Sequence, residues 1–292
     1  MAKEGRFDKL GFEGMRGIPE LTTHGHYWLS LMTKPRVLIL RAPGTNCDLE
    51  TAHAFEMAGA ETVRMHVNRL IERPQSAENF QILCFPGGFS YGDDIAAGRI
   101  LASQLDSHLS ETIDRFREED RLVLGICNGF QIMMRLGIFF ESTQKQHPAT
   151  LYWNAHGRFE DRWVHLKVEA PHSPFLQGID TLYLPMAHAE GRMIFRDEKA
   201  KDQMKEDGQL AFRYCREDGS TDSKPLPFPI NPNGAEENVA GICDPSGRIL
   251  GLMPHPERHL FATHHPFWTR RETQPEFGEG FAIFKNAVSY FA

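Results

Sequence analysis

Apolar runs and helical periodicity alternate along the first half of the chain. Four strand-like patterns, bounded by glycine, proline or polar residues, occupy residues 36–40, 62–67, 81–85 and 122–126. Ahead of the fourth, apolar residues recur at mostly three- and four-residue spacing, as on one face of a helix: Ile100, Leu101, Leu105, Leu109, Ile113 and Phe116. Strands and helices in alternation predict a parallel sheet covered by helices on both faces.

Two shorter helices complete this half. One is expected to be capped by Asn46 or Asp48 and to stop at Gly59, and the other to end at Gly137. Ligands of such sheets bind beyond the carboxyl ends of the strands. The loops expected at that edge are residues 42–47, 86–94 and 126–129.

The second half consists of short strand patterns with tight turns and a closing amphipathic helix over residues 281–288. The strand patterns occupy residues 164–168, 182–184, 210–214, 239–242 and 249–253. The predicted fold class is therefore α/β, an open and mostly parallel sheet with extra antiparallel strands in the C-terminal half. Because no linker pattern separates the halves, residues 35–292 are expected to form one domain. Residues 1–34 lack clear periodicity and are expected to be an extension whose role stays open.

Composition narrows the choice of partners and compartment. The chain of 292 residues has a net charge of −7 with interspersed signs, which argues against nucleic acid or an anionic membrane as its main partner. No apolar run approaches the roughly 20 residues that span a bilayer, and the N-terminus lacks a signal-peptide core. A cytoplasmic protein is expected.

Five cysteines are scattered without a C-x-x-C pair, so neither a disulfide framework nor a metal site is predicted: Cys47, Cys84, Cys127, Cys215 and Cys243. Cys127 differs from the others because it stands where an apolar strand meets a helix, with Gly125 and Gly129 around it. This is the thiol counterpart of the G-x-S-x-G elbow. A helix N-terminus stabilises a thiolate, and the Asn128 amide would face an oxyanion beside the sulfur.

A thiol nucleophile needs a base and a group that orients the base. His255 lies in Met253-Pro-His-Pro-Glu257, directly after an apolar strand. The flanking prolines are expected to hold this segment extended, so that His255 and Glu257 point the same way. A proline-rich turn with a solvated His and Glu fits the pattern alone equally well, and the elbow favours the catalytic interpretation.

Gly87 and Gly88 follow another strand, and paired glycines bring backbone amides close to a ligand. They are predicted to bind substrate, with Gly88 as the second oxyanion donor. Cys47 follows the first strand in a similar loop and is the rival nucleophile, although it lacks the glycine frame.

The elbow with Pro254-His-Pro-Glu-Arg258 resembles class I glutamine amidotransferases. Four further stretches are similar to the glutaminase component of phosphoribosylformylglycinamidine synthase: Pro43–Asp48, Pro86–Asp93, Ala187–Arg192 and Asn231–Gly234. The similarity runs from about residue 35 to the C-terminus. Two departures are Ala189, where the family pattern has Gly, and the added segment His264–Glu272.

The resemblance implies a specific reaction. Cys127 attacks the carboxamide of glutamine, His255 passes a proton to the departing ammonia, Glu257 orients His255, and water hydrolyses the thioester. Gln131 helps to hold glutamine, whereas His188 and Glu190 lie near the site without an assigned role. Ammonia passes to a separate synthetase subunit, which uses ATP and Mg²⁺ to convert formylglycinamide ribonucleotide into formylglycinamidine ribonucleotide. No cofactor is expected in this chain, and a small third subunit stays open.

Three alternatives stay open at this point. Cys127 could serve another cysteine hydrolase on a similar sheet. The chain could be a binding subunit with a vestigial triad, although its Cys, His and Glu are all intact. The glutaminase could also serve a different synthetase.

Overall fold

The structure is a computed structural model that describes residues 34–141, 146–271 and 273–292. The predicted extension, residues 1–34, lies outside them apart from its last residue, so its separation from residues 35–292 stays a prediction. The described residues belong to one compact unit, Thr33–Ala292.

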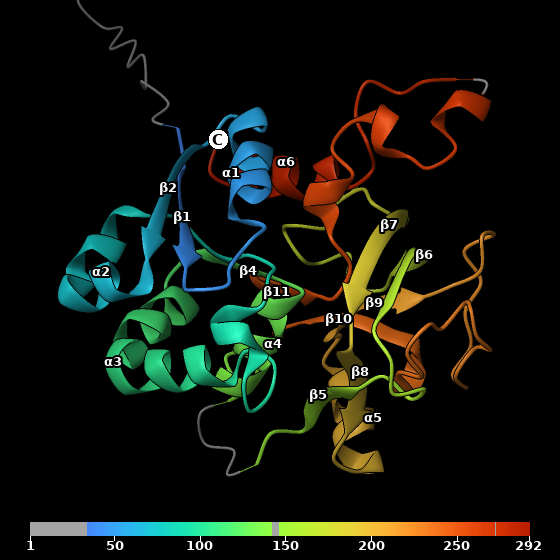
Figure 1. Cartoon of the computed structure of the whole chain (residues 1–292), viewed down its shortest axis with the longest axis horizontal. Coiled ribbons are helices and arrows are strands. Elements are labelled where there is room, and N and C mark those ends of the chain that lie inside the picture. The colour runs from blue at the N-terminus through green and yellow to red at the C-terminus, as the bar shows by residue number, and fades with distance from the viewer. Residues whose placement is uncertain (1–33, 142–145, 272) are drawn as a thin grey trace, which may run out of the picture. The chain divides into compact units, whose positions relative to one another are not determined.

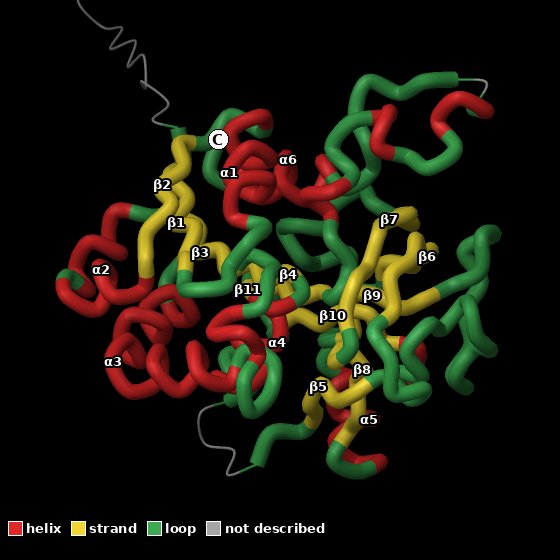
Figure 2. Tube along the Cα trace, viewed as in Figure 1, coloured by secondary structure: helices red, strands yellow, loops and turns green. Residues whose placement is uncertain are grey.

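A mixed sheet runs through this unit (Figures 1 and 2). Within the described chain, nine strands pair in the order β2-β1-β3-β4-β11-β10-β9-β6-β7. They are β1 Arg36–Arg41, β2 Glu61–His66, β3 Ile82–Phe85, β4 Leu122–Ile126, β6 Glu160–Val168, β7 Thr181–His188, β9 Leu210–Tyr214, β10 Val239–Cys243 and β11 Ile249–Leu252. Pairing is parallel from β2 to β11 and antiparallel from β11 to β7. The predicted fold class is confirmed.

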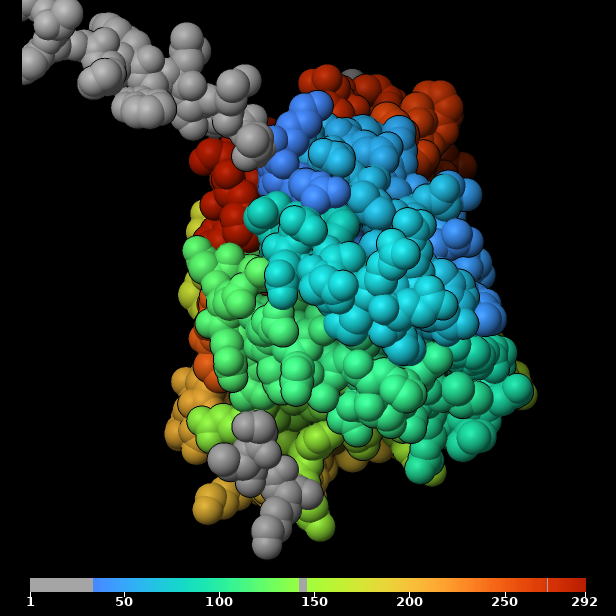
Figure 3. Space-filling model, turned by 90° about the vertical axis from the view of Figure 1, so that its left-hand side faces the viewer, coloured from blue at the N-terminus to red at the C-terminus, as the bar shows by residue number. Residues whose placement is uncertain are grey.

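Helices cover both faces of the parallel part, as predicted. In Figure 1, α1 and α6 lie on one side of it and α3 and α4 on the other, and each pair is in contact. The helices are α1 Asp48–Met57, α2 Val67–Glu72, α3 Arg99–Glu118, α4 Asn128–Leu136, α5 Glu198–Glu206 and α6 Phe281–Ser289. Figure 3 shows the surface at the left of Figure 1, which residues from β2 to α3 largely form (cyan to green). Among the described residues, no helix is long and apolar enough to cross a bilayer.

The core explains the strand patterns. Strands β3, β4 and β11 are buried along their whole length, because helices cover them on both sides. In contrast, β6 and β7 alternate between buried and partly exposed residues, as expected of antiparallel strands at the edge of a core. The sequence analysis did not predict the two-stranded sheet of β5 (Ala149–Trp153) and β8 (Glu190–Phe195), which lies beside the candidate site.

The predicted cap of α1 is wrong. Cys47 is the N-cap residue and makes no side-chain cap hydrogen bond, and Asp48 is already the first helical residue. The carboxylate of Asp48 instead pairs with Arg41 at 2.7 Å and with Arg64 at 3.0 Å. These ion pairs engage the carboxylate that the sequence pattern assigned to the helix N-terminus. They also leave Cys47 where the loop after β1 enters α1.

Candidate active site

Cys127 occupies a strained turn between β4 and α4. Its φ is +51° and its ψ is −107°, which an L residue adopts only when the surroundings impose it. A Cβ at Gly129 would lie 1.8 Å from the Phe85 carbonyl oxygen, and one at Gly125 would lie 2.3 Å from Met133 Sδ. The two glycines therefore let the turn pack directly on β3 and α4. The elbow predicted from the sequence is present.

The elbow opens into a cavity of about 150 Å³. Its lining includes Gly88, Cys127, Gln131, Ala187, His188 and Glu190. Cys127 is 5% exposed, and its Sγ lies 3.7 Å from the Ala187 carbonyl oxygen. The thiol thus lies buried at the wall of a small cavity, where it is largely shielded from bulk water.

Two backbone amides at this cavity are free to receive an oxyanion. The N–H groups of Gly88 and Asn128 donate to no group in the described part of the chain. Gly88 has a φ of +148°, and a Cβ there would lie 2.8 Å from the Asn46 amide nitrogen. Only glycine fits this position, which keeps the amide of residue 88 beside Cys127.

Hydrogen bonds fix the side chains at the start of α4. Asn128 Oδ1 accepts from the Ser90 amide at 3.0 Å, and Asn128 Nδ2 donates to Asp93 and to Gln131 Oε1, each at 3.0 Å. Gln131 Nε2 donates to the Glu190 carbonyl oxygen. These bonds tie α4 to the loop after β3 and to the first residue of β8, so the walls of the cavity hold one another in place.

His255 and Glu257 form a buried pair behind Cys127. His255 Nδ1 lies 2.6 Å from Glu257 Oε1, and both residues are nearly inaccessible to solvent. The prediction that this segment is extended is wrong. Pro256–Arg258 forms a 3₁₀ turn, because proline favours the first position of a helical turn. The turn, rather than an extended chain, brings the carboxylate under the imidazole.

The surroundings of His255 favour its charged form. Burial disfavours an imidazolium, but the Glu257 carboxylate and the nearby thiols of Cys127 and Cys47 outweigh burial, and the pKa of His255 is raised well above its ordinary value. Glu257 on Nδ1 leaves Nε2 as the nitrogen available to a reacting group. This is the arrangement of a thiol, a base and an orienting carboxylate.

Gly87 lies behind this pair and is absent from the residues that line the cavity. A Cβ there would lie 2.8 Å from His255 Cε1 and 3.2 Å from Cys47 Sγ. Its carbonyl oxygen accepts from the Cys47 amide at 3.2 Å. The structure thus shows Gly87 making room for the imidazole, and its predicted contact with substrate stays a prediction.

Cys47 lies near the same imidazole on the side away from the cavity, in the protein interior. It is completely buried, and its Sγ, a nitrogen of His255 and an oxygen of Glu257 lie within 4.8 Å of one another. Arg258 Nη2 donates to Cys47 Sγ at 3.1 Å. The sequence analysis did not foresee this cluster, because Cys47 and His255 are 208 residues apart and no local pattern connects them.

His188 is a further polar group at the cavity. Its Nδ1 lies 3.1 Å from Asn154 Oδ1, whereas its buried Nε2 has no hydrogen-bond partner among the residues that the structure describes. Burial, together with the positive charge of His255, lowers the pKa of His188 to about 3, so the ring is neutral. The neighbouring Ala189 does not have a positive φ. Alanine in place of the family's glycine is therefore not strained at this position.

This geometry is that of a glutamine amidotransferase, and comparison with known proteins agrees. A family model described as the CobB/CobQ-like glutamine amidotransferase domain matches residues 34–291. A relative from Dehalococcoides mccartyi, phosphoribosylformylglycinamidine synthase subunit PurQ, is 46% identical over 89% of this chain and 98% of its own length. A relative of the same name from Methanococcus maripaludis is 44% identical over 88% of this chain and 97% of its own.

Solved structures give the same result. The structure of PurLQS from Thermotoga maritima contains a chain that is 27% identical, with a TM-score of 0.65 and coverage of 89% of this chain and 100% of that one. The glutaminase domain of Trypanosoma brucei CTPS, at 10% identity and a TM-score of 0.51, covers 88% of this chain and 94% of its own and shows the fold alone. The chain belongs to the glutamine amidotransferase family and, within it, to the phosphoribosylformylglycinamidine synthase subunits.

Proposed function

We propose that the chain hydrolyses glutamine at Cys127 and supplies ammonia to a separate synthetase, which makes formylglycinamidine ribonucleotide in purine biosynthesis. One observation carries the proposal: the elbow presents Cys127 to a small cavity, while His255, paired with Glu257, interacts with the same thiol from within the protein. The family relationship supplies the acceptor, since the site alone specifies only the release of ammonia.

In the first half of the reaction, the Cys127 thiolate attacks the side-chain carbonyl carbon of glutamine. The carbonyl π electrons move to oxygen, and the amides of Gly88 and Asn128 stabilise this oxyanion. The His255 imidazolium then protonates the nitrogen, the carbon–nitrogen bond breaks, and ammonia leaves. A glutamyl thioester on Cys127 and a neutral His255 remain.

In the second half, neutral His255 takes a proton from water, and the resulting hydroxide oxygen attacks the thioester. The carbon–sulfur bond breaks, which releases glutamate and restores the thiolate and imidazolium. Glu257 keeps His255 in the orientation that both proton transfers need. In this proposal Gln131 borders the bound glutamine. No step requires a cofactor in this chain, and the synthetase is the subunit that uses ATP and Mg²⁺.

The mouth of the cavity supports a hand-over to a partner. Four large apolar side chains that line it are between 46% and 80% exposed: Phe89, Ile95, Trp153 and Phe159. Apolar groups gathered at one opening are typical of a surface that another protein covers. A synthetase seated there would receive ammonia before it reaches bulk solvent. We also propose a cytoplasmic location, because all five cysteines are free thiols.

The test measures formylglycinamidine ribonucleotide made by the chain with its candidate synthetase, ATP, Mg²⁺ and formylglycinamide ribonucleotide. Wild-type protein should use glutamine, and glutamine hydrolysis by the isolated chain should be weak. Cys127→Ser should abolish synthesis from glutamine but leave synthesis from an ammonium salt intact. The buried Cys215→Ser variant is the matched control and should retain both activities.

Three outcomes would count against the proposal. Glutamine hydrolysis that survives in both Cys127→Ser and His255→Ala would exclude this mechanism. Normal glutaminase activity without synthesis by any partner that uses formylglycinamide ribonucleotide would show that the ammonia serves a different synthetase. If the chain does not turn over glutamine at all, it is a cysteine hydrolase with a different substrate.

A further inference from the structure

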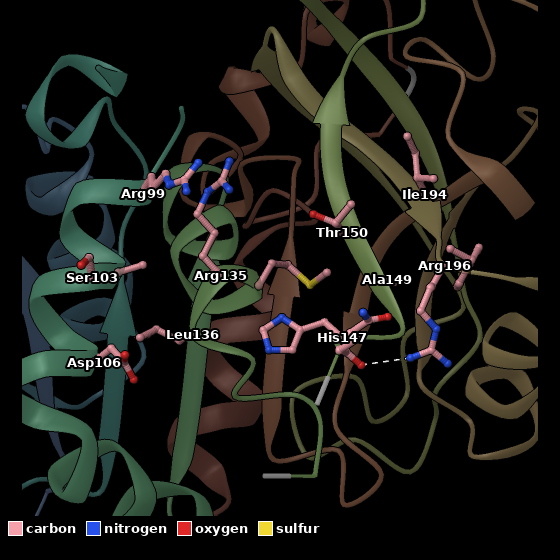
Figure 4. Close-up of a pocket in the computed structure, with 14 residues that line it drawn as sticks. Arg99, Ser103, Asp106, Arg135, Leu136, His147, Ala149, Thr150, Ile194 and Arg196 are labelled. Atoms are coloured by element: carbon pink, nitrogen blue, oxygen red, sulfur yellow. Dashed lines mark hydrogen bonds between the residues drawn. The ribbon is translucent and has the colours of Figure 1, made fainter. Parts of the chain in front are cut away.

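A second cavity of about 880 Å³ lies between α3, α4 and the β5–β8 sheet (Figure 4). We call it the arginine pocket, because its lining includes Arg99, Arg135 and Arg196, with His147 beside them. Its volume is within the roughly 300–1,000 Å³ range of small-molecule sites. It is distinct from the cavity at Cys127, whose lining shares none of these residues.

Two of the three arginines in the pocket are paired with carboxylates: Arg135 with Glu190 at 2.7 Å and Arg196 with Asp197 at 2.9 Å. Among its described lining residues, Asp106 is the one carboxylate. The guanidinium of Arg99, at the start of α3, makes no hydrogen bond or ion pair to any part of the chain that the structure describes. In Figure 4 the guanidinium groups of Arg99 and Arg135 lie near each other at one end of the pocket. An unpaired guanidinium beside a second one whose carboxylate partner is Glu190 is a favourable environment for an anion.

Arg135 connects this pocket with the candidate active site. Its Nη2 donates to Glu190 Oε1 at 2.7 Å, and its Nε donates to the Ala97 carbonyl oxygen at 2.8 Å. Glu190 and Ala97 line the Cys127 cavity, and the Glu190 carbonyl oxygen accepts from Gln131. An anion that binds Arg135 therefore weakens the ion pair between Arg135 and Glu190. Glu190 in turn lines the cavity at Cys127 and accepts a hydrogen bond from Gln131.

We propose that the arginine pocket binds a small phosphate-bearing molecule, and that its occupancy changes glutamine binding through Arg135 and Glu190. The Arg99 and Arg135 guanidinium groups take the phosphate oxygens, and the remaining volume accommodates the rest of the ligand. The coupling rests on the proposed function, whereas the binding site does not. By linkage, the ligand and glutamine must change each other's affinity by the same factor.

Binding is tested by titrating the full chain with inorganic pyrophosphate and, separately, with adenosine diphosphate in a calorimeter. The two probes distinguish a site for the phosphate group alone from one that also contacts a nucleoside. Arg99→Gln should weaken binding about tenfold or more, because it removes charge-assisted hydrogen bonds. Arg69→Gln, an exposed arginine on α2, is the matched control and should bind like wild type. Absence of binding, or equal affinity for wild type and Arg99→Gln, would overturn the site.

Coupling is tested with Cys127→Ala protein, which holds glutamine without turning it over. Saturating glutamine should shift the Kd of the bound probe by about fivefold or more. In the active chain, Arg99→Gln should leave basal glutamine hydrolysis unchanged and abolish the effect of the probe on the KM for glutamine. Binding of the probe that glutamine does not alter would overturn the coupling. Failure of glutamine to bind at all would instead overturn the proposed function, while the calorimetric titration still decides the site.

Discussion

Two loops at the same edge of the sheet each bring a cysteine to one imidazole, yet they differ in almost everything else. Cys127 follows β4, has a positive φ, and lines the cavity. Cys47 follows β1, is completely buried, and accepts a hydrogen bond from Arg258 at 3.1 Å. Nearness to His255 is therefore not what distinguishes a nucleophile. What distinguishes Cys127 is its strained backbone turn and the contact of its thiol with the cavity.

The difference also explains what each loop does for the imidazole. The elbow exposes a thiol between two free amides, where a carbonyl carbon can be attacked. The Cys47 loop places its thiol beside the ring, where Gly87 from the loop after β3 also packs and Arg258 donates to the sulfur. One loop supplies chemistry, and the other supplies packing around the base.

The largest expected effect comes from removing the space that the elbow needs. Gly129→Ala places a Cβ 1.8 Å from the Phe85 carbonyl oxygen, so that α4 would have to move away from β3. We expect a loss of more than about 3 kcal/mol in the free energy of unfolding, or a failure to fold. Urea unfolding measures it. Gly157→Ala, which has a positive φ but open space, is the control and should cost about 1 kcal/mol.

The next effect concerns the base that both loops share. Glu257→Gln removes the carboxylate that, with the two nearby thiols, offsets the effect of burial on His255, so the pKa of His255 should fall. We expect kcat/KM for glutamine to fall about 10- to 100-fold and its decline at high pH to begin at a lower pH. A pH–rate profile measures both. An unchanged profile would show that Glu257 does not set the protonation of His255.

A smaller effect is expected from His188, on the cavity side. The unfolded chain takes up a proton near the ordinary pKa of 6.5, whereas folded His188 does so only near pH 3. Stability should therefore fall as pH drops from 6.5, by up to about 1.4 kcal/mol per pH unit from this residue. Urea titrations at several pH values should show a shallower slope for His188→Gln than for the exposed control His108→Gln. Equal slopes would contradict a neutral His188.

The smallest effect should come from the second cysteine. Cys47→Ala removes a buried thiol that faces no substrate, so we expect less than about a threefold change in kcat and a loss of about 1–2 kcal/mol in stability. Steady-state kinetics and thermal unfolding measure these. A loss of activity comparable with that of Cys127→Ser would break the comparison.

Local patterns in the sequence predicted much of this fold and site. Gly125 and Gly129 around Cys127 identified the elbow, since such a turn requires small neighbours in sequence. The pairing of His255 with Glu257 was predictable because only one residue separates them in the sequence. Buried apolar runs likewise predicted β3 and β4.

Contacts between distant segments were not predictable. Nothing near Cys47 indicates that Arg258 and His255 pack against it, and nothing near Arg135 indicates Glu190. Gly87 was interpreted through its neighbour Gly88, although its missing side chain makes room for a ring 168 residues away. The cap of α1 was misassigned because Arg41 and Arg64 compete for Asp48. Tertiary packing decides these features, and one sequence does not encode it locally.

The most direct measurement is covalent labelling with an electrophilic glutamine analogue, followed by digestion and mass spectrometry. Our account predicts one label per chain, on the peptide that contains Cys127, with protection by glutamine. The Cys127→Ala protein should remain unlabelled, and Cys47→Ala should be labelled like wild type. A label on Cys47, or glutamine-protected labelling that persists in Cys127→Ala, would contradict the claim that Cys127 is the nucleophile.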